Sequence, residues 1–156
     1  MSEIRAIYNS IEAMDEMTYD SDVYDTDTAI PCRDLDELRE TGLKSGDAPI
    51  RILSLPNPPV FEFATMGKGA VATWFIRDTF YYKPVSQGEG LRKAWEKLVV
   101  YTGSYMEAIR NNRMPTTQSE IESAEFDLRS DLLWGAEDTP YFGVEVTLTV
   151  VERLQS

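Results

Sequence analysis

The sequence predicts an α+β fold in which a mostly antiparallel sheet carries two helices on one face. Two segments, residues 2–17 and 91–109, repeat apolar residues at helical spacing. Residues 60–82 hold a glycine-rich turn between two strand-like arms, as in a β-hairpin. Residues 142–150 alternate between apolar side chains and polar or small ones, the pattern of a half-buried strand. The length suits one hydrophobic core, so we expect a single domain over residues 1–156.

Three helices are predicted from apolar spacing and charge. The first covers residues 2–17, where Ser2 can cap the start. A short helix is predicted at residues 34–39, because acidic residues precede a basic one. The long helix starts after Gly90, is expected to lie across the sheet, and ends at residues 111–115. Its apolar stripe is formed by Leu91, Trp95, Leu98, Val99, Thr102, Tyr105, Met106 and Ile109.

Prolines and glycines mark where the first predicted strands end and turn. A strand at residues 50–55 ends at the proline-rich stretch 56–59. The hairpin arms are residues 60–66 and 70–82. The turn between them consists of Gly67, Lys68 and Gly69, and its two glycines tolerate positive φ. Apolar side chains fall on both faces of the second arm. That distribution is a first indication of a partner.

Two further strands complete the predicted sheet, at residues 124–132 and 142–150, with a turn at 135–140 between them. Residues 18–27 are expected to form a loop or an edge strand. The adjacent aromatic pairs Trp74-Phe75 and Tyr141-Phe142 cannot both point inward on one strand, because neighbouring side chains face opposite ways. We interpret these pairs as a sign of oligomerisation.

The composition argues against two kinds of partner, nucleic acid bound by affinity and a membrane. There are 27 acidic and 15 basic residues, which give a formal net charge of −12, and no basic cluster occurs. Tight binding to nucleic acid needs clustered cations, so DNA is not expected to be bound by affinity. The negative charge would instead suit a protein that lies beside moving DNA without holding it, because it repels phosphate. No stretch approaches the roughly 20 apolar residues that span a bilayer, so no membrane association is expected.

Catalytic residues are not apparent. The chain contains no histidine, which removes the commonest general base and metal ligand. Cys32 is the only cysteine and has no resolving partner, so it is read as a small apolar side chain. Arg77-Asp78 and Glu96-Lys97 are read as surface ion pairs or helix-face charges. We therefore predict a protein that is not an enzyme and uses no cofactor.

One acidic segment has the composition of a cation site. Asp20, Asp22, Asp25 and Asp27 offer carboxylate oxygens at close spacing. An EF-hand loop counted from Asp20 would need glycine and glutamate where Asp25 and Pro31 stand. We therefore predict no metal here, and read the segment as a solvated loop or a subunit contact.

Three stretches are informative when taken together: Trp74-Phe75-Ile76-Arg77-Asp78, residues 84–91 with the helix after them, and Tyr141-Phe142-Gly143-Val144 with its strand. In these stretches and in its layout the chain resembles the tail-terminator proteins of long-tailed bacteriophages and related neck proteins. These stretches span much of residues 60–152. The resemblance implies a virion protein, assembled in the host cytoplasm, that forms a homohexameric ring. Such a ring caps the tail tube, joins it to the head connector or stopper protein, and lets DNA pass without specific binding.

The expected contact residues come from this sequence alone. We expect interfaces at the acidic loop, at the hairpin tip and on the outward face of the last strand: Asp20, Asp22, Asp25, Asp27, Gly67, Lys68, Gly69, Glu145, Thr147 and Thr149. Two alternatives stay open. One is another neck component, a stopper or head-completion protein. The other is a small-molecule binding domain that uses carboxylates and a metal.

Overall fold

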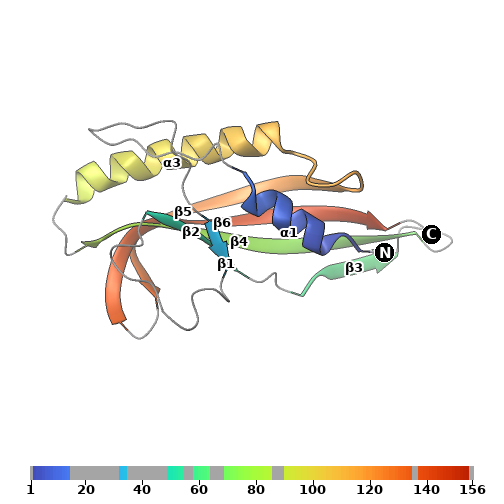
Figure 1. Ribbon diagram of the computed structural model, residues 1–156, viewed down its shortest axis with the longest axis horizontal. Helices are drawn as coiled ribbons and strands as arrows, with labels where there is room; N and C mark the ends of the chain where they lie inside the picture. The colour runs from blue at the N-terminus through green and yellow to red at the C-terminus, as the bar shows by residue number, and fades with distance from the viewer. Residues whose placement is uncertain are drawn as a thin grey trace.

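The computed structural model describes residues 2–14, 32–34, 49–54, 58–63, 69–85, 90–134 and 137–154. These residues form a two-layer α+β structure with its helices on one face of a mostly antiparallel sheet, which confirms the predicted fold class (Figure 1). The elements are α1 (Ile4–Glu12), β1 (Cys32–Asp34), β2 (Ile50–Leu53), β3 (Val60–Phe63), β4 (Ala70–Pro84), α3 (Leu91–Asn111), β5 (Ser119–Trp134) and β6 (Glu137–Leu154).

The sheet runs in the order β1, β2, β4, β6, β5, and β3 also pairs with β4. β1 and β2 are parallel, whereas the other pairs are antiparallel. On the side of β4 away from β6, β3 pairs with residues 70–73 and β2 with residues 78–81. The sheet therefore has β5 at one edge, and β3 and β1 at the other.

The two longest strands extend beyond their predicted bounds. β5 and β6 pair with each other from Ser119 to Trp134, so residues 137–140, predicted as part of a turn, belong to β6. Pairing along β4 carries β6 on to Leu154. Ladder hydrogen bonds thus extend both strands past the alternating segment from which they were predicted. The hairpin of β3 and β4 was predicted correctly.

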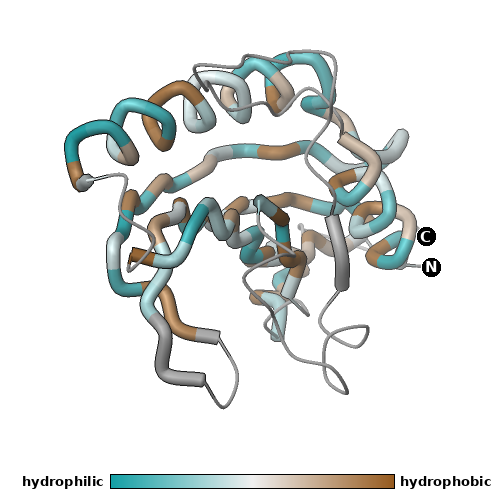
Figure 2. The backbone as a smooth tube through the Cα atoms, turned by 60° about the vertical axis from the view of Figure 1, so that its left-hand side comes forward, coloured by the Kyte–Doolittle hydropathy of each residue, from teal (hydrophilic) through white to brown (hydrophobic). Residues whose placement is uncertain are grey.

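The main core lies between the sheet and the two helices. α1 buries Ile7 and Ile11, and β6 buries its apolar set opposite them: Val144, Val146, Leu148 and Val150. The Tyr101 ring of α3 stacks on Phe80 of β4, with centroids 4.0 Å apart and planes at 13°. Figure 2 shows hydrophobic and hydrophilic positions alternating along α3 and the strands beneath it.

The inner stripe of α3 differs from the predicted one. Leu98 and Tyr105 are buried as expected, and the rest of the inner stripe consists of Ala94, Lys97, Tyr101 and Ala108. Leu91, Trp95, Val99 and Met106, which were predicted on the same stripe, are exposed. The physical reason is that α3 has apolar residues on two faces. Two alanines let one face approach the sheet closely, and the bulkier face points away.

A second, smaller core cluster lies on the opposite face of the sheet, formed by Ile50, Ile52, Tyr81, Leu132 and Tyr141. Tyr141 belongs to this cluster and Phe142 to the main core, so both are buried although they point in opposite directions. The inference that one of this pair must be exposed or contact a partner is therefore wrong. Trp74 and Phe75 are each half-buried.

Some predictions fall on parts of the chain outside the described residues, including the loop at 18–27. Of the short helix predicted at 34–39, the structure describes only Asp34, which ends strand β1 instead. Ser2 is not the N-cap of α1: that residue is Glu3, although the Ser2 hydroxyl accepts a hydrogen bond from the Ile4 amide at 3.2 Å. Neither described helix is long and apolar enough to cross a membrane.

Candidate functional site

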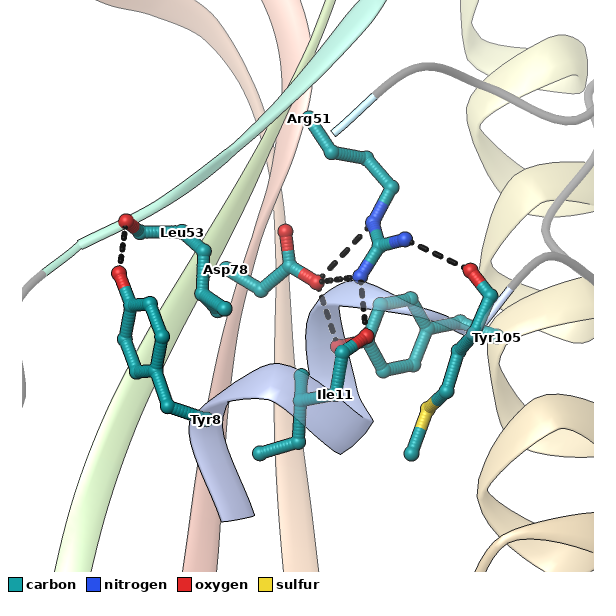
Figure 3. Close-up of polar contacts among 7 residues, drawn as sticks. Tyr8, Ile11, Arg51, Leu53, Asp78 and Tyr105 are labelled. Carbon is teal, nitrogen blue, oxygen red and sulfur yellow. Dashed lines mark hydrogen bonds and ion pairs between the residues drawn. The ribbon is translucent and has the colours of Figure 1, made fainter. Parts of the chain in front are cut away.

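A buried ion pair lies where α1, α3 and the sheet meet (Figure 3). Arg51 of β2 and Asp78 of β4 are both fully buried. The Arg51 Nε and Nη2 groups donate to Asp78 Oδ2 at 3.1 and 2.5 Å. The Tyr105 hydroxyl of α3 donates to the same oxygen at 2.7 Å. One carboxylate oxygen therefore receives three donors from two different elements.

The same guanidinium also holds the end of α1. Arg51 Nη1 donates to the Met14 carbonyl at 2.9 Å, and Nη2 donates to the Ile11 carbonyl at 3.2 Å. Helix C-termini carry unsatisfied carbonyls and a partial negative charge, which a cation stabilises. α1 has no basic residue in its last turn, so the sheet supplies that charge.

The N-terminus of α1 is held by a carboxylate from the last strand. Glu152 is fully buried and accepts hydrogen bonds from the Ser2 hydroxyl at 2.9 Å, the Glu3 amide at 2.5 Å and Trp74 Nε1 at 3.2 Å. α1 has no acid in its first turn, so Glu152 complements that end of the helix dipole. Arg51 and Glu152 thus clamp the helix at both ends.

Replacing Glu152 with glutamine is expected to lower the free energy of unfolding by about 1–3 kcal/mol. Glutamine keeps the shape of the side chain but removes the charge. Its amide nitrogen cannot accept a hydrogen bond, so one carbonyl oxygen is left for three donors. Urea denaturation followed by tryptophan fluorescence measures the change, and Glu122→Gln at an exposed position of β5 is the matched control. Equal stability of the two variants would contradict the clamp.

Tyr105 makes the fold sensitive to alkali. Burial, and then the Asp78 charge, raise the pKa of Tyr105 well above its ordinary value. Burial and the nearby Glu145 raise the pKa of Tyr81 to about 12. Because a raised folded-state pKa favours the protonated form, this stability is fully present below the unfolded pKa of about 10 and is lost as pH rises above it.

The free energy of unfolding of Tyr105→Phe is therefore expected to fall less steeply above pH 10. The difference in slope approaches about 1.4 kcal/mol per pH unit, because one proton fewer separates the folded and unfolded states. Urea titrations at several pH values between 9 and roughly 11 measure this slope. Parallel curves for the two proteins would show that Tyr105 ionises as freely in the folded state as in the unfolded one.

We read this buried cluster as a structural support that joins the two helices to the sheet. Arg51 and Asp78 are fully buried, and their hydrogen bonds join α1 and α3 to the sheet. Asp78 was read from the sequence as part of a surface pair with Arg77, and that reading is wrong: Arg77 is exposed and pairs with Glu145 at 3.2 Å. Within the described ranges, no group of three or more residues is placed to hold a metal ion.

The other predicted charge pair also differs. Glu96 lies 3.8 Å from Arg92, one helical turn earlier on α3, and both are exposed. Lys97 is buried against the sheet, with its ammonium 5.5 Å from the ring centre of Tyr82. A cation over an aromatic face is an attractive arrangement. The sequence did not distinguish these two environments.

Apolar surface is exposed along one side of α3. Leu91, Trp95, Val99 and Met106 are 58, 43, 52 and 49% exposed, and their spacing places them on one side of the helix. Val99 and Met106 line a shallow groove of about 250 Å³ together with Thr102, Gly103 and Leu128. Leu128 belongs to β5, so the groove lies between α3 and the edge strand of the sheet.

A second apolar surface lies at the opposite edge, on β3. Val60, Phe61 and Phe63 are 49, 52 and 73% exposed. The rings of Phe61 and Phe63 touch edge to face, with centroids 5.5 Å apart. Phe61 and Phe63 stand opposite Ala72 and Ala70 of β4, which are too small to cover them.

The predicted contact residues are only partly within the described structure. Asp20, Asp22, Asp25, Asp27, Gly67 and Lys68 lie outside it, and Gly69 is half-buried just before β4. Glu145, Thr147 and Thr149 are half-buried in the middle of the sheet, on the face away from the helices. On that face Glu145 forms ion pairs with Arg77 at 3.2 Å and with Arg129 at 3.5 Å.

No protein-family model matches the sequence, and no curated protein matches it.

Proposed function

We propose that this protein is a non-enzymatic virion protein of the tail-terminator type, which forms a homohexameric ring. In this role it caps the tail tube, joins it to the head connector or stopper protein, and lets DNA pass through its lumen. The resemblance to that family, carried by stretches that span much of residues 60–152, motivates the proposal. The observation that carries it is the pair of unlike apolar surfaces at opposite edges of one sheet.

Two unlike surfaces favour a ring over a dimer. A two-fold dimer uses one self-complementary patch, whereas a head-to-tail ring needs two different patches on every subunit. β3 exposes two phenylalanines at one edge, and α3 with β5 exposes an apolar groove at the other. Exposed apolar surface of this kind marks sites of association.

The face of the sheet away from α1 and α3 suits the lumen of such a ring. It carries polar side chains in the middle of the sheet, including Thr147 and Thr149, and acidic ones on β5, including Glu125 and Asp127. Arg77 and Arg129 on this face are ion-paired with Glu145, and the chain carries a net charge of −12, so this face is expected to repel phosphate. DNA would then move through without adhering.

The proposal is tested by adding the protein to polymerising tail-tube protein and measuring tube lengths by negative-stain electron microscopy. A terminator is expected to shorten the tubes in proportion to its concentration and to appear as a ring at one tube end. The control is the same preparation after heat denaturation. Unchanged tube lengths, with binding to purified connector instead, would overturn the terminator role and assign the protein to the stopper or head-completion class.

A further inference from the structure

We infer that the ring closes by strand addition: the short strand β1 of one copy pairs with the long edge strand β5 of the next copy. The two strands run antiparallel, and Arg33 of the incoming strand stands opposite Asp127. This inference rests on the proposed ring, and it names the backbone contact that joins neighbouring subunits.

Both strands offer an edge. Among the described residues β1 has β2 as its only strand neighbour, and β5 has only β6. The start of β5 is covered by its own chain, because the Ile121 amide donates to the Arg113 carbonyl at 2.8 Å, so its free edge begins beyond Ile121. An edge strand presents unpaired amides and carbonyls that a strand from another chain satisfies. β1 and β5 lie at opposite ends of the sheet, so each copy gives one strand and receives another.

The register of the sheet places β1 level with the middle of β5. One row of directly opposed residues crosses five strands: Arg33, Ile52, Thr79, Glu145 and Asp127. By the same pairings Cys32 is level with Leu128, and Asp34 with Phe126. A ring rotation moves a copy around the axis and not along it, so residues stay level where the strands run along the axis. β1 of one copy therefore meets residues 126–128 of the next.

The strand directions also fit. Within one copy β1 is parallel to β2, and each further step, from β2 to β4, to β6 and to β5, is antiparallel. Three reversals leave β1 and β5 pointing in opposite directions. Rotation about an axis along the strands preserves these directions and keeps the helices of every copy on the same side of the sheet. The incoming β1 is therefore antiparallel to β5, and the face proposed for the lumen continues from copy to copy.

Charge favours this pairing. Asp127 is exposed and stands directly opposite a second carboxylate, Glu145 of β6. Glu145 is compensated by Arg77 and Arg129, whereas Asp127 forms no ion pair within the part of the chain that the structure describes. Arg33 of the neighbouring copy brings a cation to this position. Opposite charges directly across two antiparallel strands stabilise their pairing.

The helix layer continues across the same contact. α1 packs on β2, the strand next to β1: Tyr8 donates to the Leu53 carbonyl, and Arg51 donates to the Met14 carbonyl at 2.9 Å. Pairing of β1 with β5 therefore brings α1 of one copy toward the exposed apolar side of α3 in the next. β3 lies on the same side of β4 as β2 and β1, so its phenylalanines face the same neighbour. One contact gives both apolar surfaces a partner.

The register is tested by disulfide formation with the native Cys32. Leu128→Cys places a second cysteine opposite Cys32 of the incoming strand. Within one copy β1 and β5 are four strand spacings apart, roughly 19 Å, which is too far for a disulfide. Mild oxidation of L128C is expected to give a ladder of linked subunits on a denaturing gel, and C32S/L128C is expected to give none. Ala124→Cys, on the same face of β5 but roughly 13 Å along the strand, is the matched control and is also expected to give none.

The outcomes separate this contact from the ring itself. Rings without a ladder, or a ladder as strong with A124C as with L128C, would overturn the inference but leave the ring. Monomers without a ladder, both alone and with tail tubes, would overturn both.

A charge exchange tests the pairing without added cysteines. Arg33→Asp places two acids opposite each other, and Asp127→Arg places two bases, so each variant alone is expected to weaken ring formation at least tenfold. An equal mixture of the two is expected to restore rings, because every contact between unlike copies then joins an acid to a base. Glu122→Arg, at an exposed residue of β5 outside the paired segment, is the matched control and is expected to assemble alone. If the mixture assembles no better than its separate components, with both folded by circular dichroism, Arg33 does not stand opposite Asp127.

Discussion

Replacing Phe61 and Phe63 together with aspartate is expected to abolish ring formation while leaving the subunit folded. Both side chains are more than half exposed, so the free energy of unfolding should change by no more than about 0.5 kcal/mol for each substitution. At an interface, a buried aromatic anchor typically contributes 2 kcal/mol or more. Losing two anchors is therefore expected to weaken association by roughly a thousandfold.

Light scattering over a concentration series, with circular dichroism of the same samples, measures both effects. Met114→Asp is the matched control, because Met114 is equally apolar and 63% exposed but lies outside β3 and the α3 groove. We expect the Met114 variant to assemble normally. If the phenylalanine double variant forms rings as readily as this control, β3 has no part in assembly.

Arg51→Ala is expected to give the largest loss of subunit stability, about 3–5 kcal/mol. The substitution leaves the Asp78 carboxylate buried without its cation, and removes one hydrogen bond each from the Ile11 and Met14 carbonyls at the end of α1. Urea denaturation measures the change. Arg77→Ala, which removes an exposed guanidinium from the same sheet, is expected to cost about 1 kcal/mol or less.

A double variant separates the two causes of that loss. Arg51→Met with Asp78→Leu removes both charges, so no uncompensated ion remains, and the pair is expected to cost less than the sum of Arg51→Met and Asp78→Leu. Additive losses would show that the two side chains are not coupled and would contradict the ion pair as the link between α1 and the sheet.

Much of the sheet could be predicted from the sequence because its signals are local. The alternation in β6 and the breaks around β3 and β4 depend on neighbouring residues, and both predictions are confirmed. The bounds of β5 and β6 depend instead on pairing with partner strands. Such long-range pairing carried both strands beyond their alternating segments.

The phase of α3 could not be read from spacing alone. Leu98 and Val99 are adjacent and equally apolar, yet the first is buried and the second exposed. Which stripe faces the sheet was decided by the small residues Ala94 and Ala108, because they allow close approach. The prediction ranked residues by hydrophobicity and so merged the inner stripe with the exposed one.

The buried ion pair left a signal that the sequence analysis did not use. Asp78 stands at an even position of β4 between Ile76 and Phe80, which both point to the core, so alternation places it inward. A buried carboxylate needs a cation, and Arg51 occupies an otherwise apolar strand. Joining them required knowing that β2 pairs with β4, and this pairing is visible only in the fold.

The candidate assembly surfaces were predicted unevenly. The hairpin was expected to make contacts at its tip, but its described arm β3 carries exposed phenylalanines that were not singled out. Glu145, Thr147 and Thr149 do lie on the outward face, although they are half-buried in the middle of the sheet. The groove beside Gly103 was missed, because it joins α3 to β5 across the fold.

The most direct test of the central claim is the solution mass of the unmodified protein, measured by light scattering over a concentration series. Negative-stain images of the same samples, with and without tail-tube ends, show the shape of the particles. A head-to-tail assembly predicts a closed ring of about six subunits with a central hole. A monomer at every concentration, with no ring at the tube ends, would contradict it.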